Sequence, residues 1–351
     1  MRFNFLSKKI TGSEIAAAFP TLSSKLDLKR YFTLIEPDIA AVEDRIRFQA
    51  REFDPGIVGY IEYACESQGK RIRPALTMLT AHATGKPTPG HLDLAVVVEL
   101  IHLATLVHDD ILDGATKRRG EPTVFSKWGA ELSVLLGDCL FSHALKLCAH
   151  FPTTQISRTI ADAANEVCTG EILQTQRRFD LKLSIPEYLR IIEMKTAALF
   201  RVSTELSAVL SNCPPDQIAA CKTYGESLGI AYQIYDDCLD LVGSENATGK
   251  TVGTDLAKGK LTLPLLHVLQ QAQGEEHEAL SEIILHGTPE DRLSLLALVL
   301  DRGGLKASIR KIQSYLDQAV GSLDLLPPSP AREALQSIPQ ALRDHVASLQ
   351  S

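Results

Sequence analysis

Two acidic segments of identical spacing are the residues in this chain best suited to chemistry. One runs from Asp109 to Asp113 and the other from Asp236 to Asp240, and both read Asp-Asp-x-x-Asp. Residues four apart on a helix lie on one face, so each segment stacks two carboxylates that repel unless a cation lies between them. Mg²⁺ suits such a place, because it commonly binds through one or two carboxylates plus substrate phosphates. The spacing predicts two facing, magnesium-binding helix faces.

Cationic segments flank the first acidic motif. Gly69-Lys70-Arg71-Ile72-Arg73-Pro74 precedes it, a basic turn at residues 117–120 follows it, and His102 shares its helix face. Arginine binds phosphate oxygens with two parallel hydrogen bonds, and lysine adds a point charge. Most such clusters are only solvated surface charges. Beside paired acidic faces, however, they predict a site for two polyphosphorylated substrates, one held through metal and one held by basic side chains.

Composition excludes several classes of protein. The chain has 351 residues, 45% of them hydrophobic, and a formal net charge of -7. This mildly acidic balance predicts no nucleic-acid partner. Seven cysteines without a Cys-x-x-Cys pair are typical of reduced core residues in a cytoplasmic protein. The longest apolar stretch, residues 94–107, contains Glu99 and His102 and is too short to span a bilayer, so we expect a soluble protein.

Helical periodicity dominates the chain, and alternating strand-like segments are nearly absent. Residues 14–32 favour a helix broken at Pro20, and Gly/Pro-rich turns separate the helical blocks that follow. We therefore predict a single all-α domain. The segments around Gly170–Gln174 and Glu193–Thr196, taken alone, are interpreted as ordinary half-exposed helix faces. Met78 and Trp128 are interpreted as packing residues.

In order and spacing, these motifs resemble the trans-isoprenyl diphosphate synthases, also called polyprenyl synthetases, and most closely the long-chain, octaprenyl-like members. The resemblance covers residues 35–351, and residues 1–34 are expected to be an N-terminal extension. It implies an all-α helical bundle around a central deep cavity, and a homodimer. The matching signatures are Gly69–Pro74, Ile101-His102, Asp109–Asp113, Arg118-Arg119-Gly120, Gly137-Asp138, Gly170-Glu171, Lys195-Thr196, Gln233, Asp236–Asp240 and Gly249–Pro264.

The resemblance also implies a role for individual residues. The substrates would be isopentenyl diphosphate and an allylic diphosphate, with Mg²⁺ as cofactor. The implied metal ligands are Asp109, Asp113 and Asp236, with Asp237 and Asp240 in support. The implied contacts of the allylic diphosphate are Arg118, Lys195, Thr196, Gln233, Lys250 and Lys260, and those of isopentenyl diphosphate are Lys70, Arg73, His102 and Arg119. Lys195 and Lys250 are expected to act in catalysis together with the three metal-binding aspartates.

Product length is predicted from the helical turn before Asp109. Members of the family with bulky aromatic residues at this turn stop the growing tail early. Ala104 and Thr105 are small, which favours a long-chain polyprenyl diphosphate that partitions into a membrane. The length itself, the preferred allylic primer and the pathway served are not determined by the sequence.

Four alternatives remain to be weighed against this interpretation. The pair His108-Asp109 is also typical of His-Asp metal-dependent phosphohydrolases. Membership of that class, however, gives no reason for a second acidic motif. Terpene cyclases share one acidic motif and normally lack the loop at residues 69–74. A non-catalytic regulatory subunit usually loses acidic motifs that are intact here. A short-chain farnesyl or geranylgeranyl diphosphate synthase differs only in product length.

Overall fold

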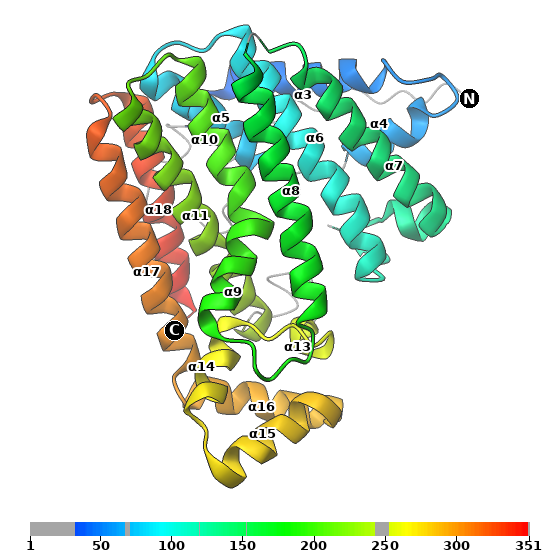
Figure 1. Ribbon diagram of the computed structural model, residues 1–351, viewed down its shortest axis with the longest axis vertical. Coiled ribbons are helices and arrows are strands. Elements are labelled where there is room, and N and C mark those ends of the chain that lie inside the picture. Colours follow the sequence, from blue (N-terminus) through cyan, green and yellow to red (C-terminus); the bar gives the residue numbers. More distant parts are fainter. Residues whose placement is uncertain (1–31, 67–70, 119, 152, 243–252, 350–351) are drawn as a thin grey trace. The chain divides into compact units, whose positions relative to one another are not determined.

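The computed structural model describes residues 32–66, 71–118, 120–151, 153–242 and 253–349 (Figure 1). Helices make up nearly all of the regular structure in these residues. The described strands are β1 (Lys117–Arg118) and β2 (Glu121–Pro122), which pair antiparallel as a short hairpin. The all-α prediction is confirmed. The predicted helix over residues 14–32 lies almost wholly outside the described residues.

The helices vary widely in length, and two of the longest, α6 and α11, carry the two acidic motifs. The first group is α3 (Glu36–Ala50), α4 (Val58–Glu66), α5 (Ile72–Thr84), α6 (Pro89–Leu112), α7 (Val124–Cys148), α8 (Thr154–Gln176), α9 (Ile185–Ile192) and α10 (Ala198–Leu210). The second group is α11 (Pro215–Val242), α13 (Thr254–Ala257), α14 (Leu263–Gln271), α15 (Gly274–His286), α16 (Pro289–Asp301), α17 (Gly304–Ser322) and α18 (Pro330–Ser348). Two irregular turns complete them, the π-helix η1 (Glu193–Ala197) and the 3₁₀-helix η2 (Leu323–Leu325).

The chain divides into two compact units, neither of them continuous in sequence. Unit 1 comprises residues 1–160, 203–218 and 325–341, and unit 2 comprises residues 161–202, 219–324 and 342–351. The first acidic motif belongs to unit 1 and the second to unit 2. The predicted boundary between residues 34 and 35 stays a prediction.

In unit 1, α6 is the central helix and packs against α3, α4, α5 and α7. Thr88 precedes it, with Pro89 at its first position and the His91 ring closing a capping box. At 24 residues α6 is longer than the apolar stretch seen in the sequence, and by length and composition it could cross a membrane. However, 67% of its most apolar window is buried inside the protein. Burial on most sides explains why the helix is apolar all round.

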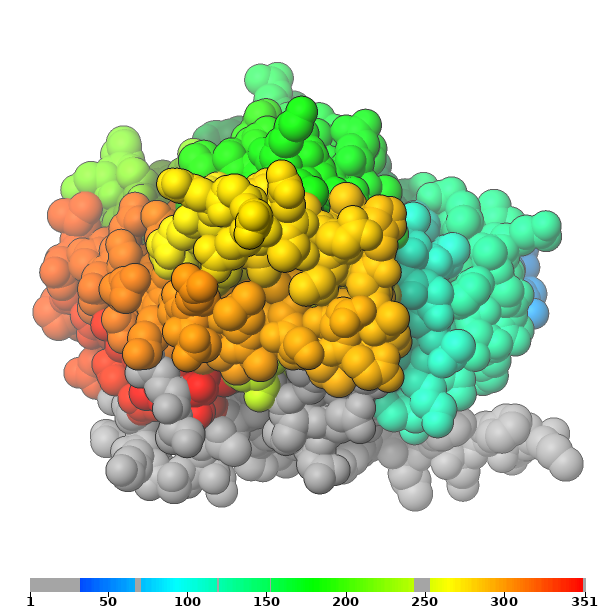
Figure 2. All heavy atoms as spheres, turned by 90° about the horizontal axis from the view of Figure 1, so that it is seen from below, coloured from blue at the N-terminus to red at the C-terminus, as the bar shows by residue number. Residues whose placement is uncertain are grey.

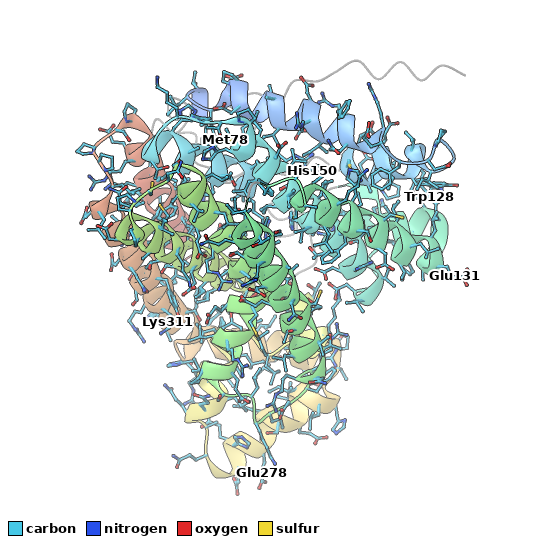
Figure 3. All side chains as sticks on the ribbon, turned by 45° about the horizontal axis from the view of Figure 1, so that its top comes forward. Met78, Trp128, Glu131, His150, Glu278 and Lys311 are labelled. Carbon is cyan, nitrogen blue, oxygen red and sulfur yellow. The ribbon has the colours of Figure 1, made fainter. Side chains whose placement is uncertain are left out.

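Two packing predictions for unit 1 are tested by its side chains. Met78 on α5 is completely buried, which confirms its interpretation as a packing residue. Trp128 stands near the start of α7 (Figure 3), edge-on to the rings of Tyr60 and Tyr63 on α4. The Tyr63 hydroxyl donates to the Pro122 carbonyl at 2.7 Å, which ties the hairpin to α4. Trp128 therefore packs as predicted, and it does so beside the basic hairpin.

In unit 2, α14 lies against α16 and α17, and α15 packs on α16. The contacts bury Leu266, Ile312 and Leu316 completely. Thr288 begins α16 with a capping box to Asp291, and Gly303, at φ 79°, makes the turn into α17. Figure 2 views the surface that α15 and α16 present to solvent. Of the described residues after the second acidic motif, α13 contacts α16.

Candidate active site

The first acidic motif ends a helix in unit 1. Asp109 lies in the last turn of α6, and Asp113 is its C-cap residue, whose backbone N–H donates to the Asp109 carbonyl at 2.8 Å. Both side chains are partly exposed. Four-residue spacing on one helix therefore places both carboxylates on one face, as the sequence predicts. Hard carboxylate oxygens accessible to solvent fit Mg²⁺.

The middle aspartate of this motif has a different role. Asp110 is only 5% exposed and accepts hydrogen bonds from Arg118 Nε at 3.0 Å and Nη2 at 2.8 Å. Burial raises the pKa of Asp110, and the Arg118 charge opposes that shift. The pair fixes the β1–β2 hairpin against α6. Arg118, predicted to contact the allylic diphosphate, is thus oriented by a buried carboxylate. Arg119 lies outside the described residues.

A close helix contact lies directly beside Asp109. A Cβ atom at Gly137 on α7 would come within 2.1 Å of His108 Nε2. That nitrogen is 3.1 Å from the Val134 carbonyl oxygen and 3.6 Å from Asp138. A side chain at position 137 would therefore force the His108 ring to move. Sequence reasoning noted Gly137-Asp138 as a signature but missed the contact, for which a glycine inside a helix was the available signal.

His108 is accordingly a packing residue between α6 and α7. The metal-dependent phosphohydrolase alternative requires His108 to join a cluster of metal ligands. Throughout the described ranges, no group of three or more His, Cys, Asp or Glu side chains gathers in that way. Mg²⁺ sites completed by a substrate diphosphate need no such cluster, because one or two carboxylates suffice.

The predicted isopentenyl diphosphate contacts come from two packed helices of unit 1. Arg73 lies in the first turn of α5 and His102 lies on α6, and both are partly exposed. These helices pack against each other. Lys70, which was assigned to the same substrate, lies outside the described residues. Arg73 and His102 thus lie on neighbouring helices, and their role in binding isopentenyl diphosphate stays a prediction.

The predicted chain-length residues lie one turn before Asp109 on α6. Ala104 is 1% exposed, and Thr105 is partly exposed with its hydroxyl donating to the His102 carbonyl at 2.8 Å. Both side chains are small. Their effect on product length stays a prediction.

The second acidic motif, on α11 in unit 2, presents one exposed carboxylate. Asp236 is exposed, whereas Asp237 is 7% exposed and accepts hydrogen bonds from Tyr188 Oη at 2.5 Å and Gln233 Nε2 at 2.8 Å. Burial, helped by the nearby Asp255 carboxylate, raises the pKa of Asp237 to about 8. Asp237 therefore joins α9 to α11, and Asp236 is the carboxylate of the pair that solvent reaches.

Asp240, the last residue of the motif, caps a short helix. Its Oδ1 accepts from the Thr254 hydroxyl at 2.6 Å, and its Oδ2 accepts from the Asp255 backbone N–H at 3.0 Å. A carboxylate at a helix N-terminus satisfies backbone donors that lack partners within the helix. Asp240 thus anchors the segment that leads to Lys260. The supporting metal roles assigned to Asp237 and Asp240 stay predictions.

Lys195 and Thr196 lie on the π-helical turn η1 rather than on the ordinary amphipathic helix predicted. Two glycines permit neighbouring helices to approach this turn. A Cβ at Gly170 on α8 would lie 2.6 Å from the Lys195 backbone nitrogen, and one at Gly229 on α11 would lie 2.7 Å from the Ala197 Cα. Such turns are frequent at functional sites. They break the regular spacing that sequence reasoning uses.

The side chains of this turn are held by polar partners. Lys195 Nζ pairs with the Glu171 carboxylate and donates to Gln174 Oε1 at 2.9 Å. The Thr196 hydroxyl donates to Gln233 Oε1 at 2.7 Å. Glu171 and Gln174 are partly exposed on α8, as the half-exposed interpretation has it, and both contact the Lys195 ammonium group. Three of the residues predicted to contact the allylic diphosphate therefore come together in unit 2: Lys195, Thr196 and Gln233.

Lys260 is the last described residue predicted to contact the allylic diphosphate, and it follows a turn that packs against Phe179. Phe179 has a left-handed φ of 58°, and its backbone N–H donates to the Gly259 carbonyl at 2.8 Å. A Cβ at Gly259 would lie 2.4 Å from the Phe179 ring. The α8–α9 connection therefore packs directly on the residue before Lys260. Lys250 lies outside the described residues.

We expect the Tyr188→Phe variant to be less stable by about 1–3 kcal/mol, because it leaves the buried Asp237 carboxyl with one hydrogen bond fewer. Urea unfolding of both proteins measures the difference. Tyr235→Phe is the matched control, since Tyr235 is as buried, at 6% exposed, and its ring contacts His345. Equal stability of Tyr188→Phe and the parent chain would contradict a structural role for this hydrogen bond.

Comparison with known proteins agrees with the resemblance. The family model described as Polyprenyl synthetase matches residues 55–298. An octaprenyl diphosphate synthase of Escherichia coli (strain K12) is 33% identical over 312 residues, which cover 88% of this chain and 96% of that protein. A short chain isoprenyl diphosphate synthase of Methanothermobacter thermautotrophicus is also 33% identical, covering 84% of this chain and 93% of the relative. The crystal structure of a decaprenyl diphosphate synthase from Rhodobacter capsulatus has a TM-score of 0.85 and 34% identity, covering 91% of this chain and 99% of its own.

Proposed function

This chain belongs to the polyprenyl synthetase family, and we propose that it condenses isopentenyl diphosphate with an allylic diphosphate to give a long-chain polyprenyl diphosphate. Mg²⁺ is the proposed cofactor and the cytoplasm the proposed location. Relatives that make products of different lengths are equally similar to this chain, so product length rests on its own residues.

The observation that carries the proposal is the arrangement around η1 in unit 2. The exposed Asp236 lies three residues after Gln233 on α11, and Gln233 hydrogen-bonds Thr196, which adjoins Lys195. A carboxylate, an amide, a hydroxyl and an ammonium group thus lie on two connected elements, α11 and η1. Carboxylate oxygens suit a hard cation, and the other groups suit phosphate oxygens. A phosphorylated substrate bound through a metal ion fits this set of side chains.

The chemistry follows from where charge develops. Breaking the allylic C–O bond leaves a carbocation and a highly charged pyrophosphate. The ammonium groups of Lys195 and Lys260 stabilise negative charge on the departing oxygens. When bound, Mg²⁺ would supply Lewis-acid stabilisation of the same charge; Asp109 and Asp113 would hold one ion at the first motif, and Asp236 would hold a further ion at the second.

The carbocation is attacked by the double bond of isopentenyl diphosphate, and a proton then leaves to the departing pyrophosphate. Arg73 and His102 orient the attacking substrate. No side chain needs to act as a nucleophile in this sequence. The enzyme therefore depends on positioning and on charge stabilisation.

The reaction is tested directly with purified protein. Labelled isopentenyl diphosphate is incubated with Mg²⁺ and either farnesyl or geranylgeranyl diphosphate, and the products are separated by chromatography. We expect consumption of isopentenyl diphosphate and products that exceed the primer by several units. Absence of any condensation would reject the function and favour the non-catalytic subunit.

A homodimer is part of the proposal. Val134 and Leu135 on α7 are 44% and 61% exposed, within the apolar run of residues 131–148. Adjacent exposed apolar side chains mark interaction surfaces, and two-fold dimers are the commonest oligomers. A second copy of the chain packed on α7 would bury both.

We expect light scattering to give the mass of a dimer for the parent chain and of a monomer for the Leu135→Arg variant, because a buried unpaired charge opposes association. Leu293 on α16, also 61% exposed, provides the matched control, and Leu293→Arg should remain dimeric. A monomeric parent chain, or dissociation of both variants alike, would contradict α7 as the interface.

A further inference from the structure

A buried arginine connects four helices of unit 1. Arg71 is the N-cap residue of α5, and its guanidinium pairs with Glu43 on α3 and, at 2.7 Å, with Glu99 on α6. It also donates to the Cys65 carbonyl on α4 at 3.1 Å. The Arg71 side chain is 2% exposed. One side chain therefore fixes the start of α5 relative to three neighbouring helices.

Stability alone does not account for this cluster. Charges removed from water lose hydration that their mutual attraction often fails to recover, and apolar side chains of similar volume serve a core as well or better. Moreover, Arg71 has a left-handed φ of 46°, which is unfavourable for a residue with a Cβ. The Glu99 Oε2 atom is buried, and it has no hydrogen-bond partner among the described residues. Strained backbone and buried charge of this kind concentrate at functional sites.

The residues next to the cluster are those proposed to bind isopentenyl diphosphate. Arg73 lies two residues after Arg71, in the first turn of α5. His102 lies three residues after Glu99, and residues three apart are neighbours on a helix surface. The Arg71–Glu99 ion pair thus ties the turn that carries Arg73 to the stretch of α6 that carries His102.

We propose that Arg71 is a positioning residue for isopentenyl diphosphate. Its planar guanidinium holds Glu43 and Glu99 at fixed directions, which sets the first turn of α5 against α6 and so aligns Arg73 with His102. A lysine cannot replace it, because an ammonium group lacks the rigid fork. The inference rests on the proposed function, since it concerns one substrate of that reaction.

The test separates positioning from stability by replacing the whole cluster. In the triple variant Arg71→Met, Glu43→Leu, Glu99→Leu, no charge is left unpaired, so the thermal midpoint should equal or exceed that of the parent chain. We expect the KM for isopentenyl diphosphate to rise about tenfold or more, because small displacements of a binding group have large effects. The KM for the allylic diphosphate should change by less than about twofold.

The Arg45→Met variant is the matched control. Arg45 on α3 pairs with Asp93 on α6 at 2.6 Å, so it joins two of the same helices, but both side chains lie at the surface, 48% and 38% exposed. Exposed pairs contribute little. This variant should leave both KM values unchanged.

A stable triple variant with an unchanged KM for isopentenyl diphosphate overturns the inference, as does an equal rise for both substrates. If the triple variant shows no cooperative thermal transition, the two KM values are measured for Glu99→Gln instead. This variant keeps the shape of the side chain and removes its charge, and a rise confined to the KM for isopentenyl diphosphate would support the inference. A parent chain that consumes no isopentenyl diphosphate would instead reject the proposed function, and the two failures are thereby distinguished.

Discussion

Replacing Asp236 by alanine is expected to lower turnover about a thousandfold or more while leaving the fold intact. The loss follows because, in the proposed mechanism, several kcal/mol of transition-state charge stabilisation depend on a metal ion held by this carboxylate. The fold is preserved because Asp236 is exposed, in contrast to Asp237, whose oxygens accept buried hydrogen bonds. Asp109→Ala should give a similar loss, since Asp109 is partly exposed at the end of α6.

The measurement is steady-state turnover at saturating concentrations of both substrates, with circular dichroism to check the fold. Asp216→Ala is the matched control, because Asp216 is another exposed aspartate on α11, in its first turn. Raising the Mg²⁺ concentration should recover little activity in Asp236→Ala. Near-normal turnover of either Asp109→Ala or Asp236→Ala would refute a mechanism that needs metal at both motifs.

The acidic motifs could be predicted from the sequence because their geometry is local. Four-residue spacing on a helix places Asp109 with Asp113, and Asp236 with Asp240, on one face whatever surrounds them. Helices α6 and α11 do carry these residues. The all-α fold was predictable for the same reason, since helical periodicity is a property of neighbouring residues.

Partners far apart in the sequence could not be predicted in this way. Tyr188 and Asp237 are 49 residues apart, and Arg71 lies 28 residues from both Glu43 and Glu99. No local pattern distinguishes a tyrosine that contacts a buried carboxylate from one that only packs. As a result, no local pattern shows that Asp237 is buried while Asp236 is exposed, or that Asp240 caps α13.

The π-helical turn η1 illustrates a second limit. Regular helical spacing assigns Lys195 to an ordinary half-exposed face, but one additional residue in the turn shifts every following side chain around the axis. The available signal was the glycine at position 170, which allows α8 to touch the turn at the Lys195 backbone. A glycine inside a helix is costly, so its presence indicates a close approach.

Product length is expected to respond strongly to one residue. Ala104→Tyr should retain condensation activity but release products near the farnesyl or geranylgeranyl stage, because a large ring at this turn of α6 would block the path that we propose for the growing tail. Ala104 is 1% exposed, and packed interiors have no spare volume for a ring. The ring must therefore occupy either the space that the tail uses or space taken from the core.

Thermal unfolding separates these two possibilities. A ring forced into a packed core costs about 1–3 kcal/mol, whereas a ring in the space for the tail costs little in the absence of substrate. Ala130→Tyr, which adds the same ring at an exposed position of α7, is the control and should change neither stability nor product length. Short products with unchanged stability would identify Ala104 as lining the path of the tail. Short products from the parent chain itself would show that the small residues at this turn leave no open path, and that a bulkier side chain elsewhere ends elongation.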